Sequence, residues 1–156
     1  MGGNTPGTLE ALGRVRSFLE NLLEKAVSSS LYRTQPQDDP DQADFWNAVV
    51  SGEWSGTAES LLERLLLLEA AEGRHRDPSR PKGPRLVDLD LLVFGTELRA
   101  SDRLTLPHPR LVFRRFALEP LIEVDAAAVD PRTGEPWTRI LDALPLQGVD
   151  RTSRPW

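Results

Sequence analysis

Apolar and polar positions follow two different periods along this chain of 156 residues. Apolar residues recur every three to four positions over residues 8–25 and again over 57–72, which is the spacing of amphipathic helices. Thr8 and Thr57 are suitable N-caps for these two helices, and Gly73 is a suitable place for the second to end. Shorter apolar segments predict strands over 27–34, 45–50 and 87–94, and short helices over 110–121 and 137–144.

Polar and proline-rich segments separate these elements. Residues 35–42 contain two prolines and residues 74–85 contain three, so both segments are predicted to be loops. The polar segment 145–156 is predicted to be a loosely attached tail after a single domain over 1–144. Helices and strands are mixed, and two strands follow each other through a loop. This order indicates an α+β sandwich, in which helices cover one side of a mostly antiparallel sheet.

The composition excludes several classes of protein. Hydrophobic residues make up 39% and charged residues 28%, as in ordinary globular domains. The absence of cysteine excludes disulfides, thiolate metal sites and cysteine nucleophiles. The net charge of -5 argues against nucleic acid as a partner. The first residues do not resemble a signal peptide, and apolar runs such as 65–68 are too short to cross a membrane. We therefore expect a cytosolic protein without a membrane partner.

Two aspartates interrupt the apolar segment 87–94. Residues two positions apart in a strand point to the same side, so Asp88 and Asp90 would share one face. Two carboxylates within an apolar strand are costly to keep charged without a partner. A hard divalent cation such as Mg²⁺ would relieve this cost. Pairing of each aspartate with an arginine of the neighbouring loop is the alternative, and the local pattern leaves both open.

Basic residues precede the acidic pair. Arg74, Arg76 and Arg85 lie in the loop before it, and several guanidinium groups together with Mg²⁺ commonly hold a polyphosphate. A solvated basic loop is the alternative interpretation. The chain contains no Walker-type phosphate-binding loop, which excludes the P-loop enzymes.

Three further residues are candidates for ligand binding. Phe45 and Asn47 share a face of their predicted strand, and an aromatic ring beside an amide suits a flat heterocycle. A core phenylalanine beside an edge asparagine would give the same pattern. His108 lies between two prolines, where it could donate a hydrogen bond to phosphate or cap a turn.

Taken together, these segments resemble the 6-hydroxymethyl-7,8-dihydropterin pyrophosphokinase family of folate biosynthesis. The most specific matches are Gly-Pro-Arg-x-x-Asp-Leu-Asp at 83–90 and Pro-His-Pro-Arg-Leu at 107–111. The resemblance implies a ferredoxin-like α+β fold. It also implies a monomer that transfers the terminal diphosphate of ATP to the pterin hydroxymethyl group, with release of AMP and with two Mg²⁺ ions. Further matches lie at 29–34, 42–49, 69–74 and 114–121.

The resemblance also implies roles for single residues. Asp88 and Asp90 would hold the Mg²⁺ ions and would form the catalytic group together with Arg74 and Arg76. The residues implied for the pterin, whose ring would lie between two aromatic side chains, are Thr34, Phe45, Asn47 and Phe116. The residues implied for ATP are Glu69, Arg74, Arg76, Arg85, His108 and Arg114.

The chain departs from the family at its beginning. The family starts with a buried strand before its glycine-rich turn, whereas here Gly2 and Gly3 follow Met1 directly, so the first strand is predicted to be missing. We expect an upstream start codon to supply that strand. One alternative is that another segment fills the gap. The other is a catalytically impaired relative that binds nucleotide or pterin, or serves as an interaction module. A two-metal nuclease is a third interpretation, which the density of arginines disfavours. Smaller departures lie at Gln37, Asp38, Lys82 and Phe113.

Overall fold

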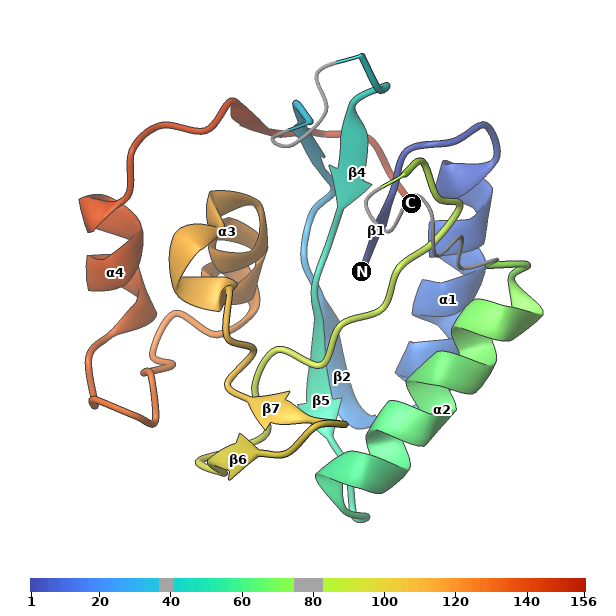
Figure 1. Cartoon of the computed structure of the whole chain (residues 1–156). Helices are drawn as coiled ribbons and strands as arrows, with labels where there is room; N and C mark the ends of the chain where they lie inside the picture. Colours follow the sequence, from blue (N-terminus) through green and yellow to red (C-terminus); the bar gives the residue numbers. More distant parts are fainter. Residues whose placement is uncertain (37–40, 75–82) are drawn as a thin grey trace.

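The computed structural model describes residues 1–36, 41–74 and 83–156. Within them it has four α-helices, α1 (Thr8–Leu22), α2 (Ala58–Ala71), α3 (Arg115–Val124) and α4 (Trp137–Ala143), and a short 3₁₀ helix, η1 (Leu111–Phe113). The strands are β1 (Gly2–Gly3), β2 (Glu24–Ser28), β3 (Tyr32–Thr34), β4 (Phe45–Asn47), β5 (Val50–Glu53), β6 (Arg99–Ala100), β7 (Thr105–Leu106) and β8 (Val149–Arg151). Figure 1 shows their arrangement.

Antiparallel pairing organises the fold. A four-stranded sheet has the order β1-β4-β3-β8. Strand β2, which precedes β3 in the chain, pairs with β5, which follows β4, so this second ladder continues the β3–β4 pair. The strands run through the middle of the molecule, with α1 and α2 on one side and α3 and α4 on the other (Figure 1). The predicted α+β class is confirmed. The prediction that helices cover only one side of the sheet is wrong.

Two apolar clusters explain why both faces are covered. Ala48 belongs to a buried cluster with Leu12 of α1 and Leu65 of α2. Val49, the next residue, belongs to a second cluster with Leu118 of α3 and Trp137 of α4. Successive residues of an extended chain point to opposite faces, so both faces of this sheet are apolar and each needs a layer of helices.

The predicted helices are confirmed, with shifted ends, whereas the strands differ more. Thr57 caps α2 as predicted, because its hydroxyl oxygen accepts a hydrogen bond from the Ser60 N–H at 3.2 Å. The prediction of Thr8 as the N-cap of α1 is wrong, because Thr8 is the first residue of that helix and Gly7 occupies the N-cap position. The predicted strands 27–34 and 45–50 each divide into two shorter strands. The predicted strand 87–94 is not regular, and its described ladder contact is one bridge between Asp88 and Gly2. No helix in the described parts of the chain is long and apolar enough to cross a membrane.

The first strand of the structure is only two residues long. Gly2 and Gly3 form β1, opposite Asn47 and Trp46 of β4. On its other side, the Gly2 N–H donates to the Asp88 carbonyl at 2.9 Å and the Asp88 N–H donates to the Gly2 carbonyl at 2.7 Å. A Cβ atom on Gly3 would lie 2.2 Å from the Leu86 carbonyl oxygen, so only glycine permits this close approach. Strand β1 thus has a partner on each side, whereas the strand predicted to be missing is the one ahead of Gly2, and this stays a prediction.

The C-terminal segment is an ordered part of the sheet, contrary to the expected loose attachment. Strand β8 pairs with β3, and Thr152 donates a backbone hydrogen bond to the Leu31 carbonyl at 2.9 Å. The Trp156 indole N–H donates to the Ser29 carbonyl at 3.0 Å, and its ring packs against the α1 side of the core. The segment is held because β3 would otherwise expose an unpaired edge.

Candidate active site

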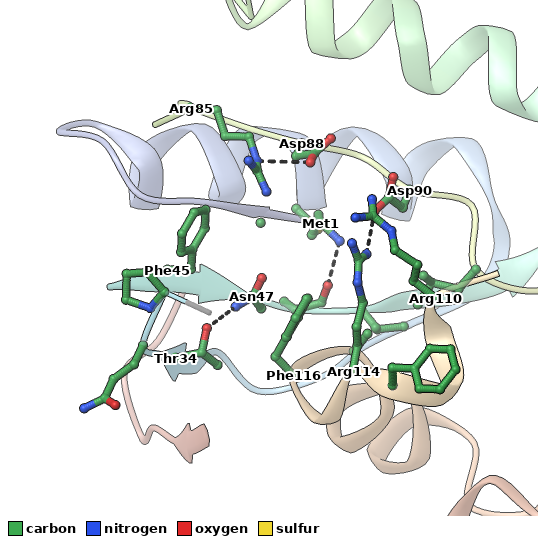
Figure 2. Close-up of a pocket in the computed structure, with 18 of the residues that line it drawn as sticks. Met1, Thr34, Phe45, Asn47, Arg85, Asp88, Asp90, Arg110, Arg114 and Phe116 are labelled. Atoms are coloured by element: carbon green, nitrogen blue, oxygen red, sulfur yellow. Dashed lines mark hydrogen bonds and ion pairs between the residues drawn. The ribbon is translucent and has the colours of Figure 1, made fainter. Parts of the chain in front are cut away.

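A cavity of about 520 Å³ lies between β1, β3 and β4, the segment after Gly83, and the start of α3. Figure 2 shows how these elements direct side chains into it from several sides. The predicted site residues that line it are Thr34, Phe45, Asn47, Arg74, Arg85, Asp88, Asp90, Arg114 and Phe116. Segments far apart in the sequence therefore meet at one place.

One half of the cavity combines aromatic rings with an amide. Phe45 and Asn47 come from β4 and Phe116 comes from α3, and the two rings flank Asn47 (Figure 2). The Asn47 side-chain amide donates to the Thr34 hydroxyl at 2.9 Å, which fixes the orientation of this buried amide. Its carbonyl oxygen can then accept from a ligand. An arginine lies over each ring, since the Arg85 guanidinium carbon is 5.0 Å from the Phe45 centroid and that of Arg114 is 5.3 Å from the Phe116 centroid.

The other half of the cavity holds the acidic pair and its arginines. One carboxylate oxygen of Asp88 pairs with Arg74, and the other lies 3.0 Å from Nε of Arg85. Burial disfavours the charged form of Asp88, but Arg85 and Arg74 outweigh it and hold the pKa of this carboxyl below its ordinary value. Asp90 is more exposed, and one of its oxygens lies 3.6 Å from the Arg114 guanidinium. The pairing of aspartates with arginines, which the sequence left as an alternative, is thus present.

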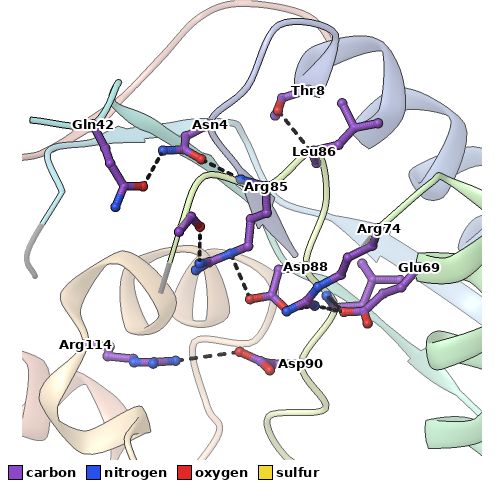
Figure 3. A network of polar contacts seen from close by, with 12 residues as sticks. Asn4, Thr8, Gln42, Glu69, Arg74, Arg85, Leu86, Asp88, Asp90 and Arg114 are labelled. Carbon is purple, nitrogen blue, oxygen red and sulfur yellow. Dashed lines mark hydrogen bonds and ion pairs between the residues drawn. The ribbon is translucent and has the colours of Figure 1, made fainter. Parts of the chain in front are cut away.

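Glu69 lies behind the cavity and not in its lining. Its side chain on α2 is buried, and one carboxylate oxygen both pairs with Arg74 and accepts from the Leu89 N–H at 2.5 Å (Figure 3). Burial raises the pKa of Glu69, and the hydrogen bond from Leu89 and the charge of Arg74 only partly offset this. Glu69 was predicted to contact ATP. Its position is that of a residue that orients Arg74 and the backbone between the two aspartates.

Asn4 links the start of the chain to both halves of the site, a role that sequence reasoning missed. Its side-chain carbonyl accepts from the Arg85 N–H at 3.0 Å, and its amide donates to Gln42 at 3.1 Å and to the Ala43 carbonyl at 3.2 Å (Figure 3). The available signal in the sequence was an asparagine directly after two glycines, and the structure buries this residue. The amide ties the arginine segment to the residues that lead into β4.

His108 lies at a second cavity, of about 560 Å³, between α2 and the β6–β7 hairpin. Asp90 lines both cavities, so the two are neighbours. The His108 Nδ1 atom accepts from the Arg110 N–H at 3.2 Å, which leaves the proton of the neutral ring on Nε2. Burial lowers the pKa of His108, although the charge of Asp90 opposes this, so the neutral ring is favoured. Arg103 and Thr105, which sequence reasoning did not select, line the same cavity.

The remaining residues of interest lie either outside the described parts of the chain or in the first cavity. Arg76, Gln37, Asp38 and Lys82 lie outside the described residues. Phe113 and Arg110 line the first cavity, and Figure 2 shows Arg110 beside Asp90. The signal for Arg110 was its place in the Pro-His-Pro-Arg-Leu motif. The Arg114 pKa is lowered mainly by burial and also by the charge of Arg110, and the charge of Asp90 opposes this.

The donor set fits Mg²⁺ bound together with a polyphosphate. Among the described residues no group of three or more histidine, cysteine or acidic side chains could hold a metal alone. Asp88 and Asp90 both direct carboxylate oxygens to the cavity (Figure 2). Protein sites for Mg²⁺ often use one or two carboxylates and leave the remaining positions to water and substrate phosphates. A pair of aspartates beside arginines meets that requirement.

Comparison with known proteins agrees with this geometry. The family model described as 7,8-dihydro-6-hydroxymethylpterin-pyrophosphokinase (HPPK) matches residues 1–126. The chain is 34% identical to the 2-amino-4-hydroxy-6-hydroxymethyldihydropteridine pyrophosphokinase of Synechocystis over 96% of its length and 76% of the relative. It is 33% identical to the protein of the same name from Pseudomonas aeruginosa, over 97% of its length and 93% of the relative.

A third relative is much longer. The folic acid synthesis protein fol1 of Pneumocystis carinii is 39% identical over 79% of this chain, and the match spans only 17% of that protein. The shared part thus corresponds to one region of a larger chain. On the family match and on the two bacterial relatives of similar length, this chain belongs to the 7,8-dihydro-6-hydroxymethylpterin-pyrophosphokinase family.

Proposed function

We propose that this chain transfers a diphosphate group from ATP to the hydroxymethyl group of 6-hydroxymethyl-7,8-dihydropterin, giving AMP and the pterin diphosphate in folate biosynthesis. The observation that carries the proposal is a single cavity with two unlike halves. Aromatic rings and a fixed amide form one half, and an acidic pair with several arginines forms the other. A flat heterocycle and a polyphosphate would each find complementary groups there, with their reacting atoms at the boundary.

The pterin would bind between the rings of Phe45 and Phe116. Stacking gives affinity for a flat ring, and the oriented amide of Asn47 gives selectivity through its free carbonyl oxygen. Thr34 acts mainly through Asn47, because its hydroxyl accepts the bond that fixes the amide. The pterin hydroxymethyl group would then point toward the acidic half.

The polyphosphate would bind to Arg74, Arg85 and Arg114, with His108 and Arg76 as further contacts. Arg74 and Arg85 neutralise Asp88 in the structure, and phosphate oxygens would take over these guanidinium groups when ATP binds. Asp88 would then be free to hold Mg²⁺ together with Asp90. Two Mg²⁺ ions bound there would neutralise the phosphate charge as the diphosphate moves.

The reaction forms a bond between the pterin hydroxyl oxygen and the β-phosphorus of ATP, and breaks the bond between that phosphorus and the oxygen that leaves with AMP. The protein contributes by positioning and by neutralising charge. Arg74 is well suited to this, because the buried Glu69 holds its guanidinium from behind the cavity and would keep this contact when phosphate replaces Asp88. In the structure the charges of Asp88 and Glu69 outweigh burial and raise the pKa of Arg74. We further propose a cytosolic monomer with ATP and the pterin as its ligands, without a nucleic-acid or membrane partner.

The test is direct. Protein, ATP, Mg²⁺ and the hydroxymethyl-dihydropterin are mixed, and AMP is measured, with Asp90→Ala as the matched control. AMP release by the wild type and its loss in the variant are expected. If the protein binds both ligands but releases no AMP, the catalytically impaired relative would be favoured instead. That interpretation is the weaker one, because both halves of the site are present. Cleavage of nucleic acid with Mn²⁺ would favour the nuclease.

A further inference from the structure

Two side chains join the segment between α4 and β8 to the start of α3. The Arg115 guanidinium donates a hydrogen bond to the Leu144 carbonyl at 3.2 Å, and Gln147 contacts the backbone on both sides of Arg114. The Gln147 side-chain carbonyl accepts a hydrogen bond from the Arg115 N–H at 2.9 Å, and its amide donates to the Phe113 carbonyl at 3.0 Å. These are the two residues on either side of Arg114. A single amide from a distant segment therefore holds both peptide groups that flank a cavity-lining arginine.

This contact supplies a cap that α3 does not have of its own. Arg114 occupies the N-cap position with an extended backbone, and its side chain makes no capping hydrogen bond. The first N–H groups of a helix have no partner within the helix, and a buried one is costly to leave unpaired. Gln147 satisfies the first of them, so it fixes the direction in which the chain enters α3 and in which the Arg114 side chain leaves it.

The Arg114 guanidinium depends on this backbone for its position. Its ion pair with Asp90 is long, at 3.6 Å, and its other described contact is with the face of the Phe116 ring. Neither contact has the short, directional geometry that would fix a guanidinium by itself.

The same segment also joins the opposite wall of the cavity. The residue after Gln147, Gly148, accepts a backbone hydrogen bond from Gln35 at 3.5 Å, and Val149 pairs with Thr34 in the sheet. Gln35 and Thr34 both line the cavity. The segment thus connects the pterin-side strand to the start of α3.

We propose that Gln147 is a positioning residue, which sets the Arg114 guanidinium for polyphosphate binding by holding the peptide groups on both sides of it. The proposal rests on the proposed function, because Arg114 contacts phosphate only if ATP binds in this cavity. Gln147 itself does not touch the ligand. If its effect passes through Arg114, the affinity lost on replacing Gln147 depends on the presence of that arginine, and this dependence can be measured.

The experiment is a double-mutant cycle read by binding. Affinity for α,β-methylene-ATP with Mg²⁺ is measured for the wild type, Gln147→Met, Arg114→Ala and the double variant. Methionine keeps the volume of glutamine without its hydrogen bonds, and Gln147→Ala serves as a second variant if the methionine protein is unstable. Leu146→Ala is the matched control, because Leu146 is the neighbouring residue and is 90% exposed.

Gln147→Met is expected to weaken binding roughly five-fold in the wild-type background and less than about two-fold when Arg114 is already alanine. The Leu146 control is expected to bind as the wild type does. An equal loss in both backgrounds would mean that Gln147 supports only the fold, and unchanged binding in Gln147→Met would equally overturn the proposal. A wild type that binds the analogue but releases no AMP from ATP would refute the diphosphate transfer and leave the role of Gln147 standing.

Discussion

Replacing Arg74 with methionine should destabilise the protein more than any exposed charge replacement. The Arg74 side chain is 13% exposed and pairs with Glu69, at 3%, and with Asp88, at 22%. Removing the cation leaves two largely buried carboxylates without their shared partner. Breaking a buried ion pair in this way costs about 3–5 kcal/mol, and the lower end applies because Arg85 still pairs with Asp88. We therefore expect a loss of about 3 kcal/mol in the free energy of unfolding, or about 10 °C in the thermal midpoint.

The assay is urea unfolding at several pH values, and the sign of the pH dependence follows from Asp88. Its folded-state pKa is lowered below the ordinary value of 3.8, so its pairing stabilises the protein above that pH and is lost as the pH falls through the lowered pKa. The difference in the free energy of unfolding between the wild type and Arg74→Met should be largest at neutral pH. It should narrow in acid, where Glu69 and Asp88 take up protons in the variant.

Arg14→Met is the matched control for this variant. Arg14 also pairs with a glutamate, Glu72 at the end of α2, but its side chain is 59% exposed. Solvent screens such a pair, so only a small, salt-sensitive change is expected. An Arg74→Met protein as stable as the Arg14→Met protein at neutral pH, or one whose deficit does not narrow in acid, would refute the reasoning about buried charge.

Three other variants test separate features of the structure. Asp90→Ala should abolish AMP release while the urea midpoint stays close to that of the wild type, because Asp90 is 41% exposed and makes one long ion pair; wild-type turnover would rule out the metal role. Gly3→Ala should lower stability by about 2–3 kcal/mol, since its Cβ would lie 2.2 Å from the Leu86 carbonyl oxygen, and an unchanged melting temperature would contradict the position of β1. Glu123 of α3 accepts hydrogen bonds from Ser30 and Tyr32 and pairs with Arg151. Burial opposes ionisation of Glu123, but these contacts outweigh it and lower its pKa from 4.5, so the stability that they contribute is present above that pH and is lost in acid. Glu123→Gln should therefore have a lower free energy of unfolding than the wild type at neutral pH, and the two values should converge below about pH 4. A difference in free energy that does not change with pH would count against the ion pair.

The chemistry of the site was largely readable from the sequence because it depends on short motifs. Asp88 and Asp90 lie two residues apart, and both do line one cavity. Phe45 and Asn47, which also lie two residues apart, line the same cavity. What periodicity could not separate was cation binding from arginine pairing, since both use the same carboxylates. The structure shows the arginine pairs, and the proposed polyphosphate would exchange them.

The sequence by itself determined the helices, the α+β class and most of the charged and aromatic side chains that line the cavity, because these follow from periods and motifs within a few residues. The tertiary structure decided what depends on contacts across the chain. Helices cover both faces of the sheet because Ala48 and Val49 each meet a separate apolar cluster. Glu69 holds Arg74 from behind the cavity, and the C-terminal segment closes the edge of β3 and brings Gln147 to the start of α3. No local pattern encodes these placements, since the free energy that fixes each one comes from pairing groups that are distant in sequence.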